Sequence, residues 1–599
     1  MEVLCPPSDA GLRLDWSPPR VPLKRHWINA RKEKRFVALS YTWKESKHEH
    51  KTHERYAVQA RDKTRYFPCK VRDCVFERIL KYMRVHDIFY LWIDRYCIAQ
   101  RACKAHHCKH KKCATKRKAL HASDLVYRNS RFPVALLGRQ MKQEQHMRLL
   151  AKILGGRLVD GGIDGARLSR KTSWEEVQGA LTLLDDITSD KWWTRAWMFQ
   201  ENYRSGTKMT LLIHHPPDLE STKGEFADVF GYVPGELSIQ STSFFKHTTL
   251  LCQAALAAGL ESDMVHRILH AAGRYSMLLH ESESMTSRII ADLQFKEVTV
   301  ESDILAIIAN CCTYPVRLDV KSLDKEDLSV NILALRLLNG EVFNNGRGRN
   351  QDLTQPKPTT ESFFFPQFEA PPKHRRLTYN KNCRFDAVYL TNAGVKTTGH
   401  LWKLGKLIHT DELLPDPLRL KPSEPTLVTR DRLKQLVNVL KDNDAQFLAR
   451  KIDHFIRYND WNLPLRPLTT SKFSHRWVLT MIQEVIAAMK DGKVLRLGRL
   501  YDSPTNATPQ ISALFICNHD DHREPFGPSD YVFTSLRPKT VDDKQRNYND
   551  LDRHVSIQVE VAGPADPLPR LYFKQWMPGS CFFSGCPRRK VVFPWPDIL

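Results

Sequence analysis

The carboxylates Asp94 and Glu201 and the arginine Arg195 lie among aromatic residues in three short stretches of the first 201 residues. Aromatic rings stack on the flat bases of nucleotides, and carboxylates accept hydrogen bonds from ribose hydroxyls. Side chains of this mixture, brought together, would suit a ligand that combines a base with hydroxyl groups. The residues that we expect to line such a site are Tyr41, Trp43, Asp94, Arg195, Trp197 and Glu201.

Each of these residues also has a purely structural interpretation. Trp192, Trp193 and Trp197 recur at helical spacing, which is more often typical of a hydrophobic core than of a ligand-binding site. Asp94 follows a predicted strand, where aspartate commonly caps a turn. Arg195 is able to form a structural ion pair with Asp94 or with Glu201. Tyr41 and Trp43, which follow the first strand, are able to cover the end of the sheet. Both interpretations stay open at the level of sequence.

A second candidate site combines cysteine and histidine. Three cysteines spaced five residues apart, with histidines among them, have the side-chain types that bind zinc in a tetrahedron. The expected ligands of a structural zinc ion are Cys103, Cys108, Cys113 and His110. The spacing is not that of standard paired-cysteine motifs, so free thiols in a basic loop are the alternative.

The same part of the chain is strongly basic. Residues 101–150 hold thirteen Lys and Arg against two acids, a large share of the formal charge of +24 for the whole chain. Such a patch is able to contact phosphates of a nucleotide or of an anionic lipid. It lacks aromatic residues for stacking, and no helix-turn-helix, finger or RNA-binding signature accompanies it. We therefore expect a solvated basic surface, and nucleic-acid binding through this basic face is the less favoured alternative.

The first candidate site needs a sheet to position it. Buried strands are predicted at Phe36–Ser40, Ile88–Ile93 and Val134–Leu137, and helices with apolar spacing separate them, including 119–126 and 174–184. Strands separated by helices indicate a parallel sheet in an α/β domain. Ligands bind such sheets beyond the carboxyl ends of the strands, where Tyr41, Trp43 and Asp94 are placed.

A chain of 599 residues is long enough for several domains. Residues 244–343 have mostly helical spacing, 344–376 have the composition of a linker, and the rest predicts helices followed by short strands. The predicted C-terminal elements include strands at 387–390, 400–407, 514–517, 531–535, 555–561, 571–576 and 591–593, and helices at 433–456 and 477–489.

The location of the protein follows from what its sequence lacks. The first twenty residues contain no apolar stretch of a secretory signal, and no segment has the roughly 20 apolar residues of a membrane span. We expect a cytoplasmic protein whose cysteines are thiols rather than disulfides.

Three blocks resemble, in order and rough spacing, the signature blocks of the fungal heterokaryon incompatibility (HET) domain. They are FVALSYTW at Phe36–Trp43, YLWIDRYCIAQ at Tyr90–Gln100 and WWTRAWMFQE at Trp192–Glu201, and the stretch Leu120–Gly138 is similar to the family's helix and strand that follow the second block. The chain departs from the family after Gln100, where a basic insert replaces a segment that usually carries an acidic residue.

The resemblance implies an architecture. It predicts an α/β HET domain at 22–203, a helical extension at 204–343, a linker at 344–376 and a mixed α/β region at 377–599. The last region holds no recognisable catalytic motif, and we expect it to sense a signal or to hold the HET domain inactive.

The resemblance also implies a function. HET proteins act in nonself recognition and trigger programmed cell death, so partners are expected to be other incompatibility proteins or further copies of this chain. HET domains distantly resemble TIR domains, several of which cleave NAD with a glutamate in a tryptophan-containing block. By that likeness Glu201 is the catalytic candidate, with Asp94 second and NAD as substrate. A non-catalytic scaffold that signals through HET-domain assembly is the alternative.

Overall fold

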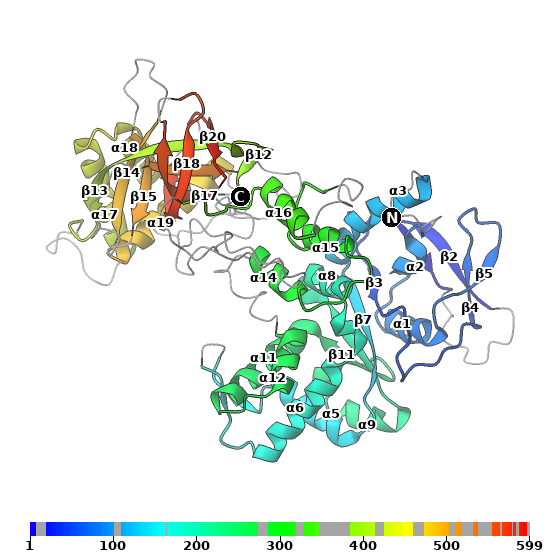
Figure 1. The fold of residues 1–599 in the computed structure, drawn as a ribbon. Coiled ribbons are helices and arrows are strands. Elements are labelled where there is room, and N and C mark those ends of the chain that lie inside the picture. Colours follow the sequence, from blue (N-terminus) through cyan, green and yellow to red (C-terminus); the bar gives the residue numbers. More distant parts are fainter. Residues whose placement is uncertain are drawn as a thin grey trace. The chain divides into compact units, whose positions relative to one another are not determined.

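The computed structural model describes residues 1–7, 20–100, 110–162, 165–273, 285–318, 328–346, 384–413, 425–458, 473–501, 511–517, 531–536, 554–563, 566–577, 579–582 and 586–595 (Figure 1). The chain divides into two compact units. The first comprises Met1–Leu279 and Ile289–Leu328, and the second comprises His280–Arg288 and Ser329–Leu599. Each unit has its own sheet and is described separately.

Four parallel strands form the centre of the first sheet. They lie in the order β10 (Thr210–His214), β7 (Phe132–Gln140), β3 (Phe36–Ser40) and β6 (Tyr90–Ile93). The predicted parallel α/β arrangement is therefore confirmed for this centre. Beyond β10 the sheet adds antiparallel β11 (Glu236–Gln240), and beyond β6 it adds β1 (Glu2–Cys5), β2 (Val21–Trp27), β4 (Tyr56–Gln59) and β5 (Tyr66–Pro68). An all-parallel sheet was thus too simple an expectation.

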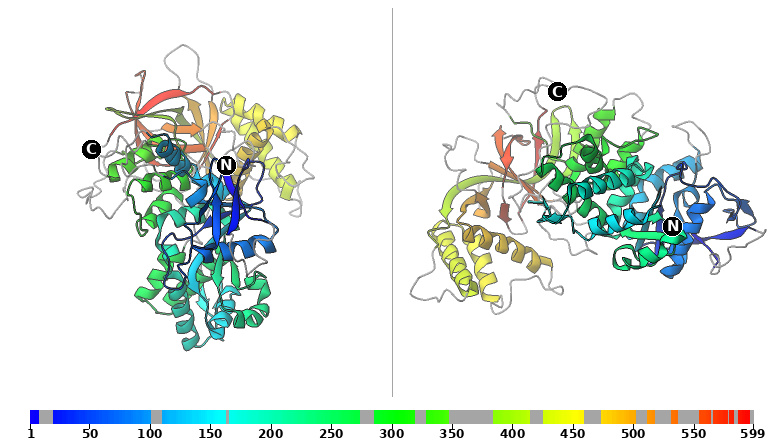
Figure 2. Two further views of the ribbon diagram at one scale, coloured as in Figure 1. Left: turned by 90° about the vertical axis from the view of Figure 1, so that its right-hand side faces the viewer. Right: turned by 90° about the horizontal axis from the view of Figure 1, so that it is seen from below.

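The central strands are apolar throughout because both faces of the sheet are covered. Within β3, Phe36 and Ala38 belong to one hydrophobic cluster, whereas Val37 and Leu39 belong to the other. Helix α1 (Asp73–Val85) covers the second face through Val75, Phe76 and Ile79. The first face is covered by α5 (Glu144–Leu154), α6 (Trp174–Thr188), α11 (Ser241–Ala257) and α12 (Asp263–Ala272). Figure 2 shows helices on either side of these blue and cyan strands.

Short elements join the strands of the first unit. The single helix predicted around 119–126 is two helices that break at Ala122, α3 (Lys111–His121) and α4 (Ser123–Asn129). The tryptophan block also forms two helices, α7 (Lys191–Thr194) and α8 (Ala196–Ser205). The other short elements are α2 (Asp94–Cys97), η1 (Gly206–Lys208), η2 (Pro217–Leu219), α9 (Glu220–Gly224), α10 (Ala227–Phe230), β8 (Val159–Asp160) and β9 (Arg167–Leu168).

Helices continue between residues 244 and 343, as the spacing predicts. After α11 and α12 come α14 (Met285–Leu293), α15 (Asp303–Cys311) and α16 (Leu328–Leu338). Helix α15 packs against α8 of the first unit, whereas Leu337 of α16 belongs to a core of the second unit. The sheet of the first unit extends from Glu2 to Gln240, beyond both ends of the range 22–203. The domain boundaries drawn from the sequence stay predictions.

The second unit is built around β13 (Gly394–His409). The first part of β13 pairs with β20 (Arg589–Phe593), and residues 400–403 pair with β16 (Tyr531–Leu536). Because β16 pairs with β17 (His554–Ala562), β17 with β18 (Arg570–Trp576) and β18 with β20, these five strands close into a ring. Gly399 lies at the change of partner, where an added Cβ would approach the Phe533 ring to 2.5 Å.

The other half of β13 belongs to an open sheet covered by helices. It pairs with β14 (Val494–Leu500), which is followed by β15 (Ile511–Cys517) and β19 (Gly579–Phe582); β12 (Asp386–Thr391) pairs with the first part of β13. Helices α17 (Pro425–Asp442), α18 (Gln446–Tyr458) and α19 (Phe473–Lys490) share a core with this sheet. The one helix predicted at 433–456 is two, because Asp444 adopts a left-handed φ of 58° between them. Strand β14 was not predicted.

In the part of the chain that the structure describes, no helix combines the length and the apolar composition needed to cross a membrane.

Candidate functional site

The carboxyl ends of β3 and β6 bring two of the predicted site residues together. These strands are parallel neighbours, so the residues that follow them lie at one edge of the sheet. Trp43 follows β3, and Asp94 begins α2 directly after β6. The Trp43 indole Nε1 donates a hydrogen bond of 2.8 Å to Asp94 Oδ2. Asp94 Oδ1 accepts a hydrogen bond of 2.6 Å from the backbone N–H of Arg95.

Glu201 lies in α8 and is buried, with 8% of its surface exposed. Burial, together with the negative charge of Asp94, raises the pKa of its carboxyl group to about 8, against the lowering effect of hydrogen bonds from Ser40 and Tyr127 and of the charge of Arg195. Among the described residues, Glu201 Oε2 has no hydrogen-bond partner. Buried polar atoms are normally paired, so an unpaired carboxyl oxygen is a feature that needs a reason.

The two hydroxyl groups beside Glu201 have other acceptors as well. Tyr127 donates to Leu39 O at 2.9 Å, and Ser40 Oγ lies 3.1 Å from Met198 Sδ. Each hydroxyl carries only one hydrogen. A protonated Glu201 fits this arrangement, because it supplies a hydrogen of its own. Neither Ser40 nor Tyr127 was singled out from the sequence; the only available signal was a polar residue ending an apolar strand.

Asp94 is half-buried and shares its electrostatic surroundings with Glu201. Burial raises the pKa of Asp94 to about 6, against hydrogen bonds from Trp43 and the backbone of Arg95 and the charges of Arg195 and Arg95. Arg195 lowers the pKa of both Asp94 and Glu201, which places its guanidinium group within electrostatic range of each. We call Trp43, Asp94, Arg195 and Glu201 the rim site.

Arg195 reaches this position because the chain is extended between α7 and α8. Its backbone has φ −91° and ψ 134° and forms a bridge with Glu297. Ala196 N donates to Glu297 O at 3.0 Å, and Glu297 N donates to Thr194 O at 2.7 Å. No ion pair joins Arg195 to a carboxylate within the described ranges. Arg195 therefore acts on Asp94 and Glu201 through its charge. Neither of the predicted ion pairs, Arg195 with Asp94 or Arg195 with Glu201, is present among the described residues.

The remaining predicted aromatic residues differ in their surroundings. Tyr41 is buried, and burial followed by the charge of Asp94 raises its pKa well above the ordinary value, so it borders the rim site. Trp197 donates from Nε1 to Asp303 Oδ2 of α15 at 3.1 Å, and no described contact joins it to the rim site. Trp192 and Trp193 are core residues with 1% and 2% exposure. The Trp192 indole nevertheless touches the site indirectly, donating to Ser40 Oγ at 2.8 Å.

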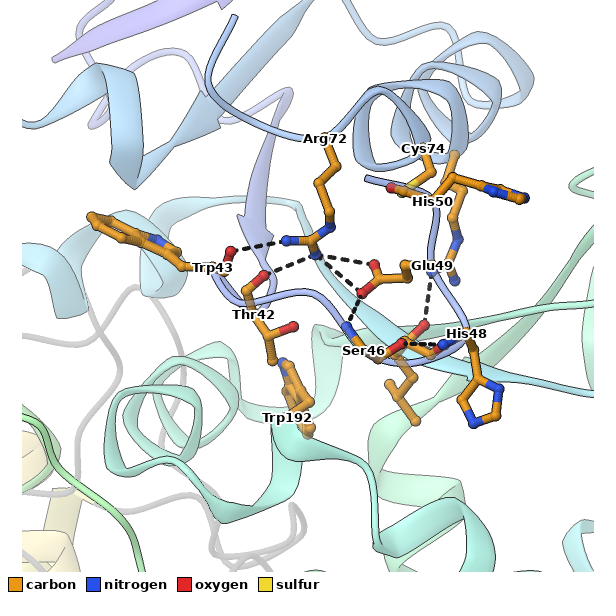
Figure 3. Close-up of polar contacts among 12 residues, drawn as sticks. Thr42, Trp43, Ser46, His48, Glu49, His50, Arg72, Cys74 and Trp192 are labelled. Carbon is orange, nitrogen blue, oxygen red and sulfur yellow. Dashed lines mark hydrogen bonds and ion pairs between the residues drawn. The ribbon is translucent and has the colours of Figure 1, made fainter. Parts of the chain in front are cut away.

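A buried ion pair holds the loop that carries Trp43. Arg72 Nη2 lies 3.0 Å from Glu49 Oε1 and donates to Thr42 O at 2.9 Å, while Nη1 donates to Trp43 O at 2.9 Å (Figure 3). Glu49 in turn accepts from the Ser46 backbone N–H at 2.9 Å. The loop is thus closed on itself around one guanidinium group. Sequence reasoning missed this pair.

The predicted zinc ligands fall only partly within the described residues. Cys103 and Cys108 lie outside them. His110 is exposed at the start of α3, and Cys113 is buried within that helix. The described part of the chain contains no cluster of three or more metal-binding side chains. The zinc site stays a prediction, which metal analysis of the purified protein would test at about one equivalent per chain.

A comparison with protein families gives one match. Residues 36–201 match the family model described as "Heterokaryon incompatibility protein (HET)". The match begins at the first residue of β3 and ends at Glu201, so it encloses all four residues of the rim site. Neither a search of curated proteins nor a search of solved structures found a match. The three sequence blocks and this match agree, and the chain is a heterokaryon incompatibility (HET) domain protein.

Proposed function

We propose that this protein is a fungal nonself-response effector that triggers cell death, and that its HET domain does so by cleaving NAD at the rim site. The observation that carries the proposal is the Glu201 carboxyl group, which is buried beside Asp94 and Arg195 and whose Oε2 has no hydrogen-bond partner in the part of the chain that the structure describes. Perturbed carboxyl groups of this kind cluster at active sites. The distant likeness of HET domains to TIR domains, several of which cleave NAD, supports the same reaction.

The rim site has the groups that this reaction needs. Cleavage breaks the bond between nicotinamide and ribose, and the bonding electrons leave with nicotinamide. The ribose carbon becomes positive, water adds to it, and the products are nicotinamide, ADP-ribose and a proton. A carboxylate near the ribose stabilises the positive charge, as in glycoside hydrolysis.

Two carboxyl groups with different pKa values are able to take different roles in the reaction. With pKa values of about 6 for Asp94 and about 8 for Glu201, Asp94 is mostly charged at neutral pH while Glu201 is mostly protonated. Asp94 would then stabilise the ribose cation, and Glu201 would orient a hydroxyl group or the attacking water. Unequal environments of neighbouring carboxyl groups commonly mark such a division.

The test is release of nicotinamide from NAD by the full-length protein, together with killing of cells that overexpress it. Glu201→Gln keeps the shape of the side chain, and we expect it to lower nicotinamide release and killing by at least about 100-fold. Glu225→Gln, which alters an exposed carboxylate paired with Arg148, is the matched control and should behave like the parent. A folded, concentrated parent protein that releases no nicotinamide would rule out NAD cleavage.

A scaffold that signals by assembly is the second candidate, and one observation favours it. Strand β5 is the outer strand of the first sheet, and all three of its residues, including Tyr66 and Phe67, are exposed. An open strand edge is able to pair with a strand of a second copy. Arg65→Glu with Phe67→Glu should then abolish both self-association, measured by light scattering, and cell killing. Under this candidate, Glu201→Gln would still kill.

A further inference from the structure

A cation that the sequence did not single out lies against the rim site. Arg95 follows Asp94 in α2 and is half-buried, and its guanidinium carbon lies 4.6 Å from the centre of the Trp43 ring. Stacking on the ring fixes the plane of the guanidinium group while leaving its N–H donors at the edge available. Within the described ranges no ion pair joins Arg95 to a carboxylate. Its charge instead lowers the pKa of Asp94.

The short turn that carries Arg95 is braced from inside. Gln100 Nε2 donates to three backbone oxygens of this turn, to Asp94 O at 3.3 Å, Arg95 O at 3.2 Å and Ile98 O at 3.3 Å. Lys116 Nζ of α3 donates to Gln100 Oε1 at 3.4 Å. The position of Arg95 is therefore fixed by one amide side chain, which in turn contacts the basic helix.

Positive charge reaches this turn from a second element. Helix α3 has five Lys and Arg and no acidic residue among its eleven residues. Its Lys116 is tied to the Asp94 turn through Gln100, and Arg195 approaches from the junction of α7 and α8. Asp94 already has two N–H donors and Glu201 lies beside two hydroxyl groups, and these contacts do not require the further cations Arg95, Arg195 and Lys116. A ligand with both hydroxyl and anionic groups accounts for the combination.

We propose that Arg95, stacked on Trp43, binds a phosphate group of a nucleotide whose ribose lies at Asp94 and Glu201. The inference rests on the proposed function, since it assumes that the rim site takes a nucleotide. It adds that the site selects phosphorylated nucleotides over nucleosides, because the planar guanidinium fork matches phosphate oxygens. Lys116 contributes charge and braces Gln100.

The test compares two probes that differ in their phosphates. Binding of ADP-ribose and of adenosine to the full-length protein is measured by calorimetry. The parent should bind ADP-ribose at least about tenfold more tightly, since hydrogen bonds between charged groups contribute that much or more. Arg95→Gln should remove this preference by weakening ADP-ribose binding about tenfold while leaving adenosine binding unchanged. Arg95→Lys keeps the charge and should fall between the two.

Arg65 provides a matched control. Its guanidinium carbon lies 4.8 Å from the centre of the Phe67 ring, a stacking geometry similar to that of Arg95, but on the outer β4–β5 hairpin. Arg65→Gln should leave both affinities at the parent values. Raising the salt concentration should weaken binding of ADP-ribose to the parent and to Arg65→Gln more than to Arg95→Gln.

The possible results separate this inference from the proposed function. If Arg95→Gln binds ADP-ribose as tightly as the parent, or if the parent does not distinguish ADP-ribose from adenosine, the phosphate role of Arg95 is wrong while nicotinamide release still stands. A parent that binds neither probe nor NAD overturns both. If Arg95→Gln unfolds, the Arg95→Lys variant provides the test. If Arg95→Lys prefers ADP-ribose over adenosine as strongly as the parent does, both at low salt and at 0.3 M salt, Arg95 does not contact a phosphate group.

Discussion

Glu201 and Glu236 are both buried carboxyl groups at the same edge of one sheet, yet their surroundings are opposite. Glu236 begins β11 and receives two hydrogen bonds from Arg78, Nε to Oε1 at 2.7 Å and Nη2 to Oε2 at 2.8 Å. Arg78 also donates to Leu137 O of β7 and to Leu212 O of β10, where the pairing register of these two strands shifts. Glu201 has no such partner, and its Oε2 is unpaired among the described residues.

The pKa values express the same contrast. Burial alone would raise the pKa of Glu236, but the charge of Arg78 and hydrogen bonds from His214 and Arg78 lower it to about 2. Burial raises the pKa of Glu201 to about 8. The comparison shows that burial does not decide whether a carboxylate is structural. The hydrogen-bond partner decides: Glu236 is paired with Arg78, which links it to β7 and β10, whereas Glu201 Oε2 has no partner among the described residues and is available for a ligand.

Breaking the Arg78–Glu236 pair should have the largest effect on stability. Arg78→Met leaves a buried charge without its partner and removes the donors to two backbone carbonyls of β7 and β10, so we expect a loss of about 3–5 kcal/mol in the free energy of unfolding. Urea unfolding followed by circular dichroism measures it. Arg148→Met is the control, because Arg148 pairs with Glu144 and Glu225 on the surface and should cost less than about 1 kcal/mol. Equal effects of the two variants would contradict the contrast.

The two carboxyl groups should give stability profiles of opposite sign in pH. The raised pKa of Glu201 means that its contribution to stability is complete below about pH 4.5 and is lost as the pH rises through about 8. Gln does not titrate, so Glu201→Gln should gain stability relative to the parent between pH 5 and pH 9, on the order of a few kcal/mol. The Glu236 contribution is present above pH 4.5 and is lost as the pH falls toward 2.

Thermal unfolding of the parent, Glu201→Gln and Glu236→Gln across this pH range measures both profiles. Glu236→Gln should be less stable than the parent at pH 7, and the difference should shrink in acid. A parent and a Glu201→Gln variant that keep a constant stability difference from pH 5 to pH 9 would show that Glu201 ionises normally.

Sequence patterns were sufficient to predict the parts of the site that follow directly after a predicted strand. The apolar run of β3 and that of β6 each bury both faces, and the residues after them fall at the edge where parallel strands end, so Trp43 and Asp94 could be placed from spacing alone. The four-residue strand β1 could not, because it adds to the sheet by antiparallel pairing and is too short to show a period.

The ion pairs that organise the fold were out of reach for another reason. Arg78 and Glu236 are 158 residues apart, and Arg72 and Glu49 are separated by the β4–β5 hairpin. A charged residue in an amphipathic helix normally faces solvent, so nothing local marks Arg78 as buried. Arg95 was likewise hidden, because its stacking on Trp43 exists only once the two strand ends meet.

The Arg72–Glu49 pair should have an intermediate effect that is local to the Trp43 loop. Arg72→Lys keeps the charge but loses the fork that holds Glu49, Thr42 O and Trp43 O, so we expect about 1–3 kcal/mol of destabilisation and faster amide exchange in residues 42–49. Hydrogen–deuterium exchange with mass spectrometry resolves this segment. Unchanged exchange there, with a variant that is otherwise destabilised, would show that the pair supports α1 rather than the loop.

The smallest effect is expected at Trp197, and it separates a bracing tryptophan from a ligand-binding one. Trp197→Phe removes one hydrogen bond to Asp303 while keeping an aromatic ring in α8, so it should cost about 1 kcal/mol or less. Because no described contact links Trp197 to the rim site, nicotinamide release and ADP-ribose affinity should stay within about twofold of the parent.

Trp43→Phe is the matched comparison: it also removes one indole hydrogen bond, but that bond ends on Asp94. It should reduce nicotinamide release at least about tenfold, because Asp94 loses the donor that orients it. Equal losses of activity in the two variants would return Trp197 to the ligand site and would show that α15, through Asp303, takes part in forming it.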